Sequence, residues 1–170
     1  SGSEGELKNV FVYIEKGLEG KSFKTPEKAV TIDQKWCVYI PHVIGVQVGQ
    51  KIEILNSDGT LHNVHAMPKN RNNDAFNEAM PGARKKITKQ FDDEELKLRI
   101  KCDVHPWMGA FIHVMNHPFF AVTDKAGNFK IEGLPAGTYT VTALHERLPP
   151  KSTTVTVSGD GDVKADFILK

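Results

Sequence analysis

The sequence predicts an all-β protein built from many short strands. Runs of alternating apolar and polar residues recur along the chain, separated by turns rich in Gly, Pro, Asn and Asp. No segment keeps a helical apolar period for more than about two turns. The apolar fraction of 39% is sufficient for a core, and 170 residues permit one ordinary domain or a small domain with an appended module.

Up to residue 116, the segments expected to be strands are 7–14, 29–40, 43–55 (a strand pair or one bent strand), 61–67, 87–91, 96–101 and 111–115. In the second of these, apolar residues of one parity predict a shared face: Val30, Ile32, Trp36, Val38 and Ile40. Leu96, Leu98 and Ile100 also alternate, and their strand should deliver Cys102 to one end of a sandwich. Residues 68–86 are polar and predict a long loop.

The charge balance excludes some classes of function. The chain has 22 Lys and Arg against 21 Asp and Glu, for a net charge of +1. A nucleic-acid-binding protein would need a clustered basic face, so no nucleic-acid partner is expected. No run reaches the ~18 apolar residues of a membrane helix, so no transmembrane segment is expected in the given chain.

Three potential metal ligands lie within seven residues, as Cys102, His105 and Met108 in the pattern Cys-x2-His-x2-Met. A thiolate and a thioether suit copper or zinc, and imidazole suits copper equally well. His62, at the end of a strand-like run, is the best candidate for a fourth ligand. Two histidines, a cysteine and a distant methionine form the ligand set of a blue-copper electron-transfer site. Zinc is the alternative metal, although methionine is a poor zinc ligand.

These motifs resemble the cupredoxins, and most closely the amicyanin and plastocyanin group. The resemblance covers about residues 35–116 and rests on Asn56-Ser57-Asp58, His62-Asn63-Val64-His65 and the Cys-x2-His-x2-Met loop. It implies a Greek-key β-sandwich over residues 33–116 that binds one copper ion. The ligands carried over by motif position are His62, Cys102, His105 and Met108.

Two further residues are expected to support this site. By resemblance to the family, Asn63 ties the two ligand-bearing segments together by hydrogen bonds near the cysteine. Pro106 fixes its own φ and stiffens the loop beside His105, which in this family is the exit for the electron.

Cys37 is not explained by the simple copper site. If the resemblance holds at this position, Cys37 approaches the metal, and three interpretations are open. The residue is an inert buried thiol, or it forms a disulfide with Cys102 when copper is absent, or it is an additional thiolate ligand that gives an atypical centre.

The sequence pattern changes beyond residue 117. The pattern Thr-Asp-x-x-Gly-x-Phe-x-Ile-x-Gly-Leu-Pro-x-Gly-Thr-Tyr, from Thr123 to Tyr139, resembles carboxypeptidase-regulatory or transthyretin-like β-sandwich modules. A module of residues 117–170 alone is short and buries little surface. Either residues 6–32 complete it, with the copper domain inserted, or the strand at 7–14 is the first strand of the copper domain.

Together these features predict a copper protein, not an enzyme, that carries single electrons between protein partners such as a cytochrome or another copper protein. The resemblance implies a periplasmic or otherwise extracytoplasmic location. The alternative function is copper delivery or storage at an atypical site involving Cys37.

Overall fold

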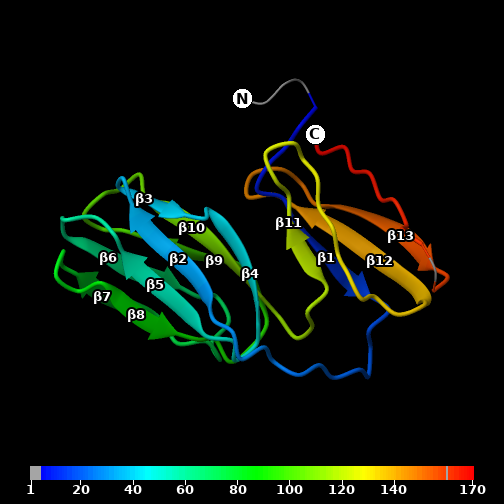
Figure 1. The fold of residues 1–170 in the computed structure, drawn as a ribbon, viewed down its shortest axis with the longest axis horizontal. Helices are drawn as coiled ribbons and strands as arrows, with labels where there is room; N and C mark the ends of the chain where they lie inside the picture. The colour runs from blue at the N-terminus through cyan, green and yellow to red at the C-terminus, as the bar shows by residue number, and fades with distance from the viewer. Residues whose placement is uncertain (1–4, 160) are drawn as a thin grey trace. The chain divides into compact units, whose positions relative to one another are not determined.

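The computed structural model describes residues 5–159 and 161–170, which form two compact units. The central unit comprises Phe23–Pro118, and the terminal unit combines the chain up to Ser22 with Phe119–Lys170. Across the described residues, thirteen strands form three sheets and no helix is present (Figure 1). The all-β prediction is therefore confirmed. No helix in this part of the chain has the length and apolar character that crossing a membrane requires.

The central unit contains two sheets. The first has the strand order β4 (Val43–Gln47), β10 (Gly109–Met115), β9 (Glu95–Lys101), β6 (His62–Met67) and β7 (Phe76–Met80). The second has the order β3 (Val38–Ile40), β2 (Val30–Lys35), β5 (Ile52–Asn56) and β8 (Lys86–Lys89). The neighbouring strands β4 and β10 are parallel, as are β2 and β5, and every other pair is antiparallel.

One apolar core joins these two sheets. It includes Ile32 and Ile54 of the four-stranded sheet and Val64, Leu98 and Ile112 of the five-stranded sheet, each at most 1% exposed. Because successive side chains of a strand point to opposite faces, each strand contributes alternate residues to this core. The strands β6 and β9 are adjacent in the sheet, so the start of β6 and the end of β9 lie at the same end of the unit.

The terminal unit has a single four-stranded sheet that uses both ends of the chain. Strand β1 (Phe11–Lys16) lies between β11 (Phe120–Val122) and β12 (Gly137–Leu144), and β13 (Lys151–Val157) pairs with β12 (Figure 1). The strand at the chain's beginning is thus paired with strands that follow the central unit in sequence.

The prediction of one continuous strand over residues 29–40 is wrong. Strands β2 and β3 form a hairpin in which Lys35 pairs with Val38, so Trp36 and Cys37 are the two turn residues. Both have positive φ, 57° and 54°, as a two-residue hairpin turn of this kind requires. Because of the turn, the residues expected to share the apolar face are not the buried ones. Tyr39 is buried at 3% exposure, whereas Trp36 is 73% exposed.

Two other expectations also differ from the structure. The segment 68–86, expected to be a loop, contains strand β7 at the edge of the sheet, where polar side chains are tolerated. Leu96 is 38% exposed rather than buried with Leu98. The cause is an irregularity in the β9–β10 register beside Lys97, whose φ is +57°, because an extra residue in one strand turns the preceding side chain to the other face.

Replacing Leu98 by Ala should lower the free energy of unfolding of the central unit by about 2–5 kcal/mol, because the change leaves a cavity in a closed core. Leu96→Ala on the same strand is the matched control and should cost clearly less. Both tryptophans of the chain, Trp36 and Trp107, belong to the central unit. Their fluorescence during urea unfolding of the metal-free protein therefore reports this unit. Equal losses in the two variants would contradict the core assignment.

Candidate metal centre

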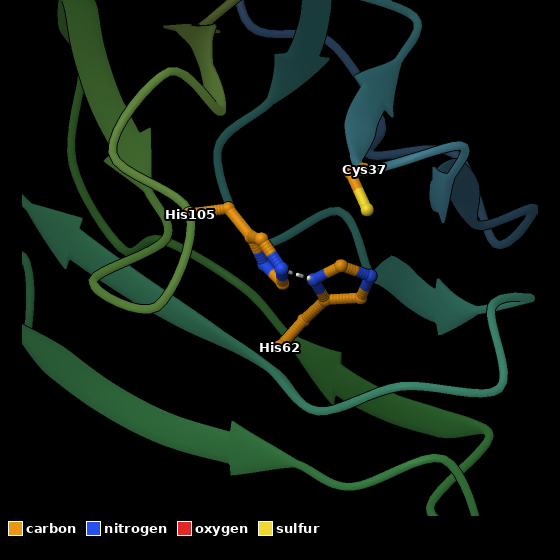
Figure 2. A group of neighbouring side chains, drawn as sticks. All are labelled: Cys37, His62 and His105. Atoms are coloured by element: carbon orange, nitrogen blue, oxygen red, sulfur yellow. Dashed lines mark hydrogen bonds between the residues drawn. The ribbon is translucent and has the colours of Figure 1, made fainter.

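Three side chains from distant parts of the sequence converge at one end of the central unit. His62 begins β6 and is fully buried, while His105 lies in the loop between β9 and β10. Their Nδ1 atoms are 3.0 Å apart. The sulfur of Cys37 completes a group whose potential ligand atoms all lie within 4.8 Å of one another (Figure 2). The geometry thus places two imidazoles and a thiol around one point.

Cys102 lies outside this group of three and contacts it through His105. Its Sγ lies 3.8 Å from Nδ1 of His105 and accepts a hydrogen bond from the backbone N–H of His105 at 3.4 Å. The loop is closed by two backbone bonds, from Cys102 N–H to the Met108 carbonyl at 3.2 Å and from Met108 N–H to the His105 carbonyl at 2.9 Å. Cys102 and Met108 are each 1% exposed. The three residues spaced Cys-x2-His-x2-Met therefore share one tight turn.

Both cysteines are free thiols in this structure. The Cys37–Cys102 disulfide raised as one interpretation is thus not formed here. Cys37 is half-buried and Cys102 is buried, and both contact the core cluster of the central unit.

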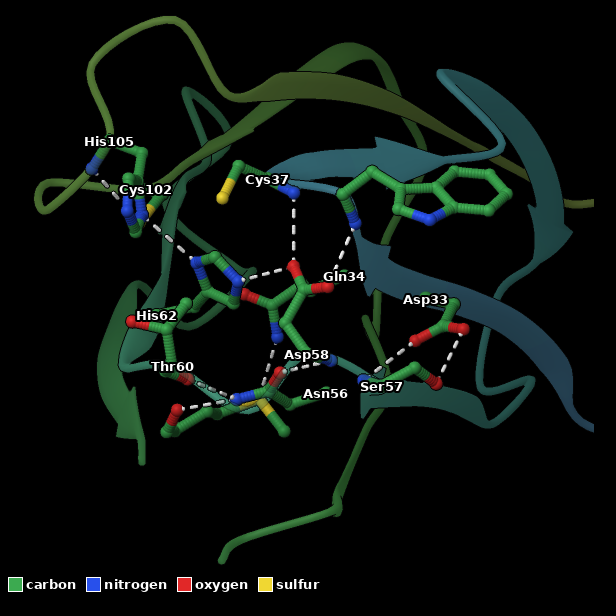
Figure 3. Close-up of polar contacts among 12 residues, drawn as sticks. Asp33, Gln34, Cys37, Asn56, Ser57, Asp58, Thr60, His62, Cys102 and His105 are labelled. Atoms are coloured by element: carbon green, nitrogen blue, oxygen red, sulfur yellow. Dashed lines mark hydrogen bonds and ion pairs between the residues drawn. The ribbon is translucent and has the colours of Figure 1, made fainter. Parts of the chain in front are cut away.

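Asp58 connects the Cys37 turn to His62. Its carboxylate accepts the backbone N–H groups of Trp36 and Cys37, each at 2.9 Å, and lies 2.9 Å from Nε2 of His62 (Figure 3). Two successive non-glycine residues in the left-handed region cost about 1–2 kcal/mol each. The carboxylate offsets this cost because it binds both of the N–H groups that the turn directs toward it.

The same carboxylate determines which nitrogen of His62 carries hydrogen. Burial opposes ionisation of Asp58, but the N–H of Cys37 and the ring of His62 together hold the pKa of its carboxyl below the usual 3.8. An ionised carboxylate only accepts, so Nε2 of His62 carries the hydrogen. In the neutral ring, Nδ1 then presents its lone pair toward His105. A metal ligand needs this orientation, and a carboxylate behind a ligating histidine commonly provides it.

Asn63 links β6 to the residue after Cys102. Its Oδ1 accepts the backbone N–H of Asp103 at 2.6 Å, and its Nδ2 donates to the Asp103 carboxylate at 3.1 Å. Lys101, Asn77 and His65 also contact this carboxylate, and together they hold the pKa of Asp103 below its usual value despite the opposing effect of desolvation. His65 therefore binds Asp103 and does not join the candidate metal centre.

Trp107 ties the ligand loop to the hairpin turn. Its indole N–H donates to the carbonyl of Cys37 at 3.0 Å, and its ring lies edge-on to His105 with centroids 5.3 Å apart. Trp107 is nonetheless 68% exposed, and Pro106 beside it is exposed as well.

The sequence alone does not indicate a role for the Asp58 side chain. Its place in a turn, four residues before a candidate histidine ligand, was the available signal. The hydrogen bond from Trp107 to Cys37 cannot be predicted from a local sequence pattern, because the two residues are 70 positions apart.

Comparison with known proteins finds similarity to two kinds of domain. A family model described as carboxypeptidase regulatory-like domain matches residues 105–170. No curated protein matches the chain.

Similar solved structures include an amicyanin mutant in its Cu(I) state, at 19% identity and a TM-score of 0.45 over 61% of this chain and 97% of that one. A purple cupredoxin from Nitrosopumilus maritimus has 19% identity and a TM-score of 0.41, covering 50% of this chain and 98% of the other.

A copper-containing nitrite reductase from Thermus scotoductus has 17% identity and a TM-score of 0.46. The similarity covers 60% of this chain but only 25% of the reductase. The sequence resembles two kinds of domain, the cupredoxins and the carboxypeptidase-regulatory modules. Both kinds are found among the proteins to which the chain is similar.

Replacing Asp58 by Asn should destabilise the metal-free protein at neutral pH by about 1–3 kcal/mol, because hydrogen bonds to a charged acceptor are lost. A carboxyl whose pKa is lowered by folding adds stability above its unfolded pKa, and this stability disappears as pH falls through the folded value. The difference between wild type and variant should therefore shrink below pH ~4. Urea unfolding at pH 7 and pH 3, followed by tryptophan fluorescence, measures it.

The control for this experiment is Glu27→Gln, which removes an exposed carboxylate that pairs with Lys24 in the same unit. That change should have little effect at either pH. A loss for Asp58→Asn that is the same at both pH values would show that its charge does not anchor the turn.

Proposed function

We propose that the central unit is a copper-binding electron-transfer domain. Its ligands are His62, Cys102, His105 and Met108, and its ligand-bearing part corresponds to residues 33–116. The observation that supports this most directly is the pair of opposed Nδ1 atoms, 3.0 Å apart, beside the buried thiol of Cys102. Copper in such a set of donors would supply a one-electron couple.

Residues of the chain itself orient and hold the proposed ligands. Asp58 keeps the lone pair of His62 directed at the site, and the hydrogen between the two Nδ1 atoms must leave before both can act as ligands. Backbone hydrogen bonds inside the 102–108 turn join Cys102 to Met108 and Met108 to His105. A site already shaped for its ion needs little rearrangement when its charge changes by one electron.

The proposed partners are redox proteins, such as a cytochrome or another copper protein, in an extracytoplasmic compartment. The half-buried ring of His105 and the exposed ring of Trp107 lie at the same end of the unit and support a short path for the electron. In this proposal the chain carries electrons and performs no substrate chemistry.

Copper delivery or storage is the second candidate function. The specific observation in its favour is the thiol of Cys37, which lies with His62 and His105 in one group of donors. An additional soft donor suits the reduced ion that such proteins hold.

We also propose that residues 117–170 act as a carboxypeptidase-regulatory-like β module completed by the segment that contains β1. The pairing of β1 with β11 and β12 supports this division of the chain.

Adding one equivalent of Cu(II) to the reduced metal-free protein should produce an intense thiolate-to-copper charge-transfer band in the visible spectrum. Cys102→Ser should lose the part of this band that comes from the thiolate of the ligand loop. A colourless or faintly coloured wild-type product would overturn the copper electron-carrier proposal and favour a zinc site.

Met108→Leu should keep the charge-transfer band but raise the midpoint potential, because removing a weak donor destabilises the more highly charged Cu(II). Met115→Leu, at the far end of β10, is the matched control and should leave the potential unchanged. Cyclic voltammetry of both variants measures the difference. Equal potentials in the two variants would remove Met108 from the ligand set.

A further inference from the structure

Cys37 lies at the tip of the β2–β3 turn, and its side chain is directed at the two histidines. Figure 2 shows its sulfur on the side where the two imidazole rings face each other. The sulfur, one nitrogen of His62 and one nitrogen of His105 all lie within 4.8 Å of one another. The thiol of Cys37 therefore approaches the same point as the imidazole ligands proposed above.

These separations are close to those within a metal's ligand shell. With metal–nitrogen and metal–sulfur bonds of about 2.1 and 2.3 Å, a nitrogen and a sulfur on one ion are at most about 4.4 Å apart. The upper limit of 4.8 Å for this group exceeds that separation only slightly. At that limit, the sulfur of Cys37 moves closer to the imidazoles when all three donors bind one ion.

The backbone of Cys37 is fixed from two sides by residues of the same site. The carboxylate of Asp58 accepts its N–H at 2.9 Å and also binds Nε2 of His62. Its carbonyl accepts the indole N–H of Trp107, from the loop that carries His105. An inert thiol filling space needs neither contact. Here the backbone that carries the thiol is joined to the segments that carry both imidazoles.

The turn itself is unfavourable for the residues that form it. Trp36 and Cys37 both have positive φ, in positions where Gly, Asn or Asp is usual. A backbone held in a sparsely populated region by surrounding contacts is typical of functional sites. At this turn, the strained conformation is what presents the sulfur to His62 and His105.

We propose that Cys37 is a second thiolate ligand of the copper site. Asp58 holds Cys37 in position relative to His62. The site then has two thiolates and two imidazoles and takes a soft ion such as copper more tightly than a site with one thiolate. This proposal rests on the copper-binding function proposed above. Binding converts the thiol of Cys37 to a thiolate, and its proton is released to solvent.

The test compares wild type with Cys37→Ser and Cys37→Ala, each loaded with one equivalent of copper. Wild type should show a charge-transfer spectrum that departs from blue, and X-ray absorption should detect two short copper–sulfur bonds. Both variants should have one short copper–sulfur bond and a blue spectrum, with copper bound at least 10-fold more weakly in competition with a chelator.

Val38→Ala is the matched control for disturbance of the turn, since Val38 is the next residue and its side chain is 40% exposed. It should leave the spectrum and the sulfur count as in wild type. Cys37→Ser is nearly isosteric and preserves the test if Cys37→Ala does not fold.

The outcomes separate this proposal from the proposed function. If the Cys37 variants keep the wild-type spectrum and sulfur count, Cys37 is not a ligand, while an intense band still supports copper at Cys102. If wild type itself lacks a thiolate band, the copper electron-carrier function and the second thiolate both fail.

Discussion

The carboxylate of Asp58 anchors the candidate metal centre, because it accepts three N–H groups from two separate segments of the chain. Two come from the backbone of a turn that has positive φ at both of its central residues, and the third comes from the buried ring of His62. A protonated carboxyl would lose acceptor capacity, so all three contacts depend on its ionised form. The position of Cys37 and the hydrogen on His62 are thus set together by one group.

A second link, between Asn63 and Asp103, connects β6 to the ligand loop in a similar way. Asn63 binds both the backbone N–H and the carboxylate of Asp103, the residue that follows Cys102. The donors therefore come from three segments that are held by hydrogen bonds between side chains and backbone. These hydrogen bonds fix how the donor-bearing segments lie relative to one another.

The sequence allowed prediction of those features that depend on short-range patterns. The spacing of Cys102, His105 and Met108 places them in one turn, and alternation in β5, β6 and β10 identifies strands of the core. The hairpin turn at Trp36 and Cys37 could not be predicted in this way, because neither residue type favours positive φ. Its conformation depends on Asp58, which lies about 20 residues away in sequence. The exposure of Leu96 likewise depends on a local irregularity that no periodicity indicates.

The sheet of the terminal unit has a consequence for the order of folding during synthesis. Strand β1 ends at Lys16, but its neighbours β11 and β12 begin only at Phe120 and Gly137. At a translation rate of about 5–20 residues per second, the strand waits for several seconds or more before either partner leaves the ribosome. The central unit, whose strands are all contiguous in sequence, is complete by then. The apolar segment from Val10 to Ile14 is meanwhile without its sheet partners on the nascent chain.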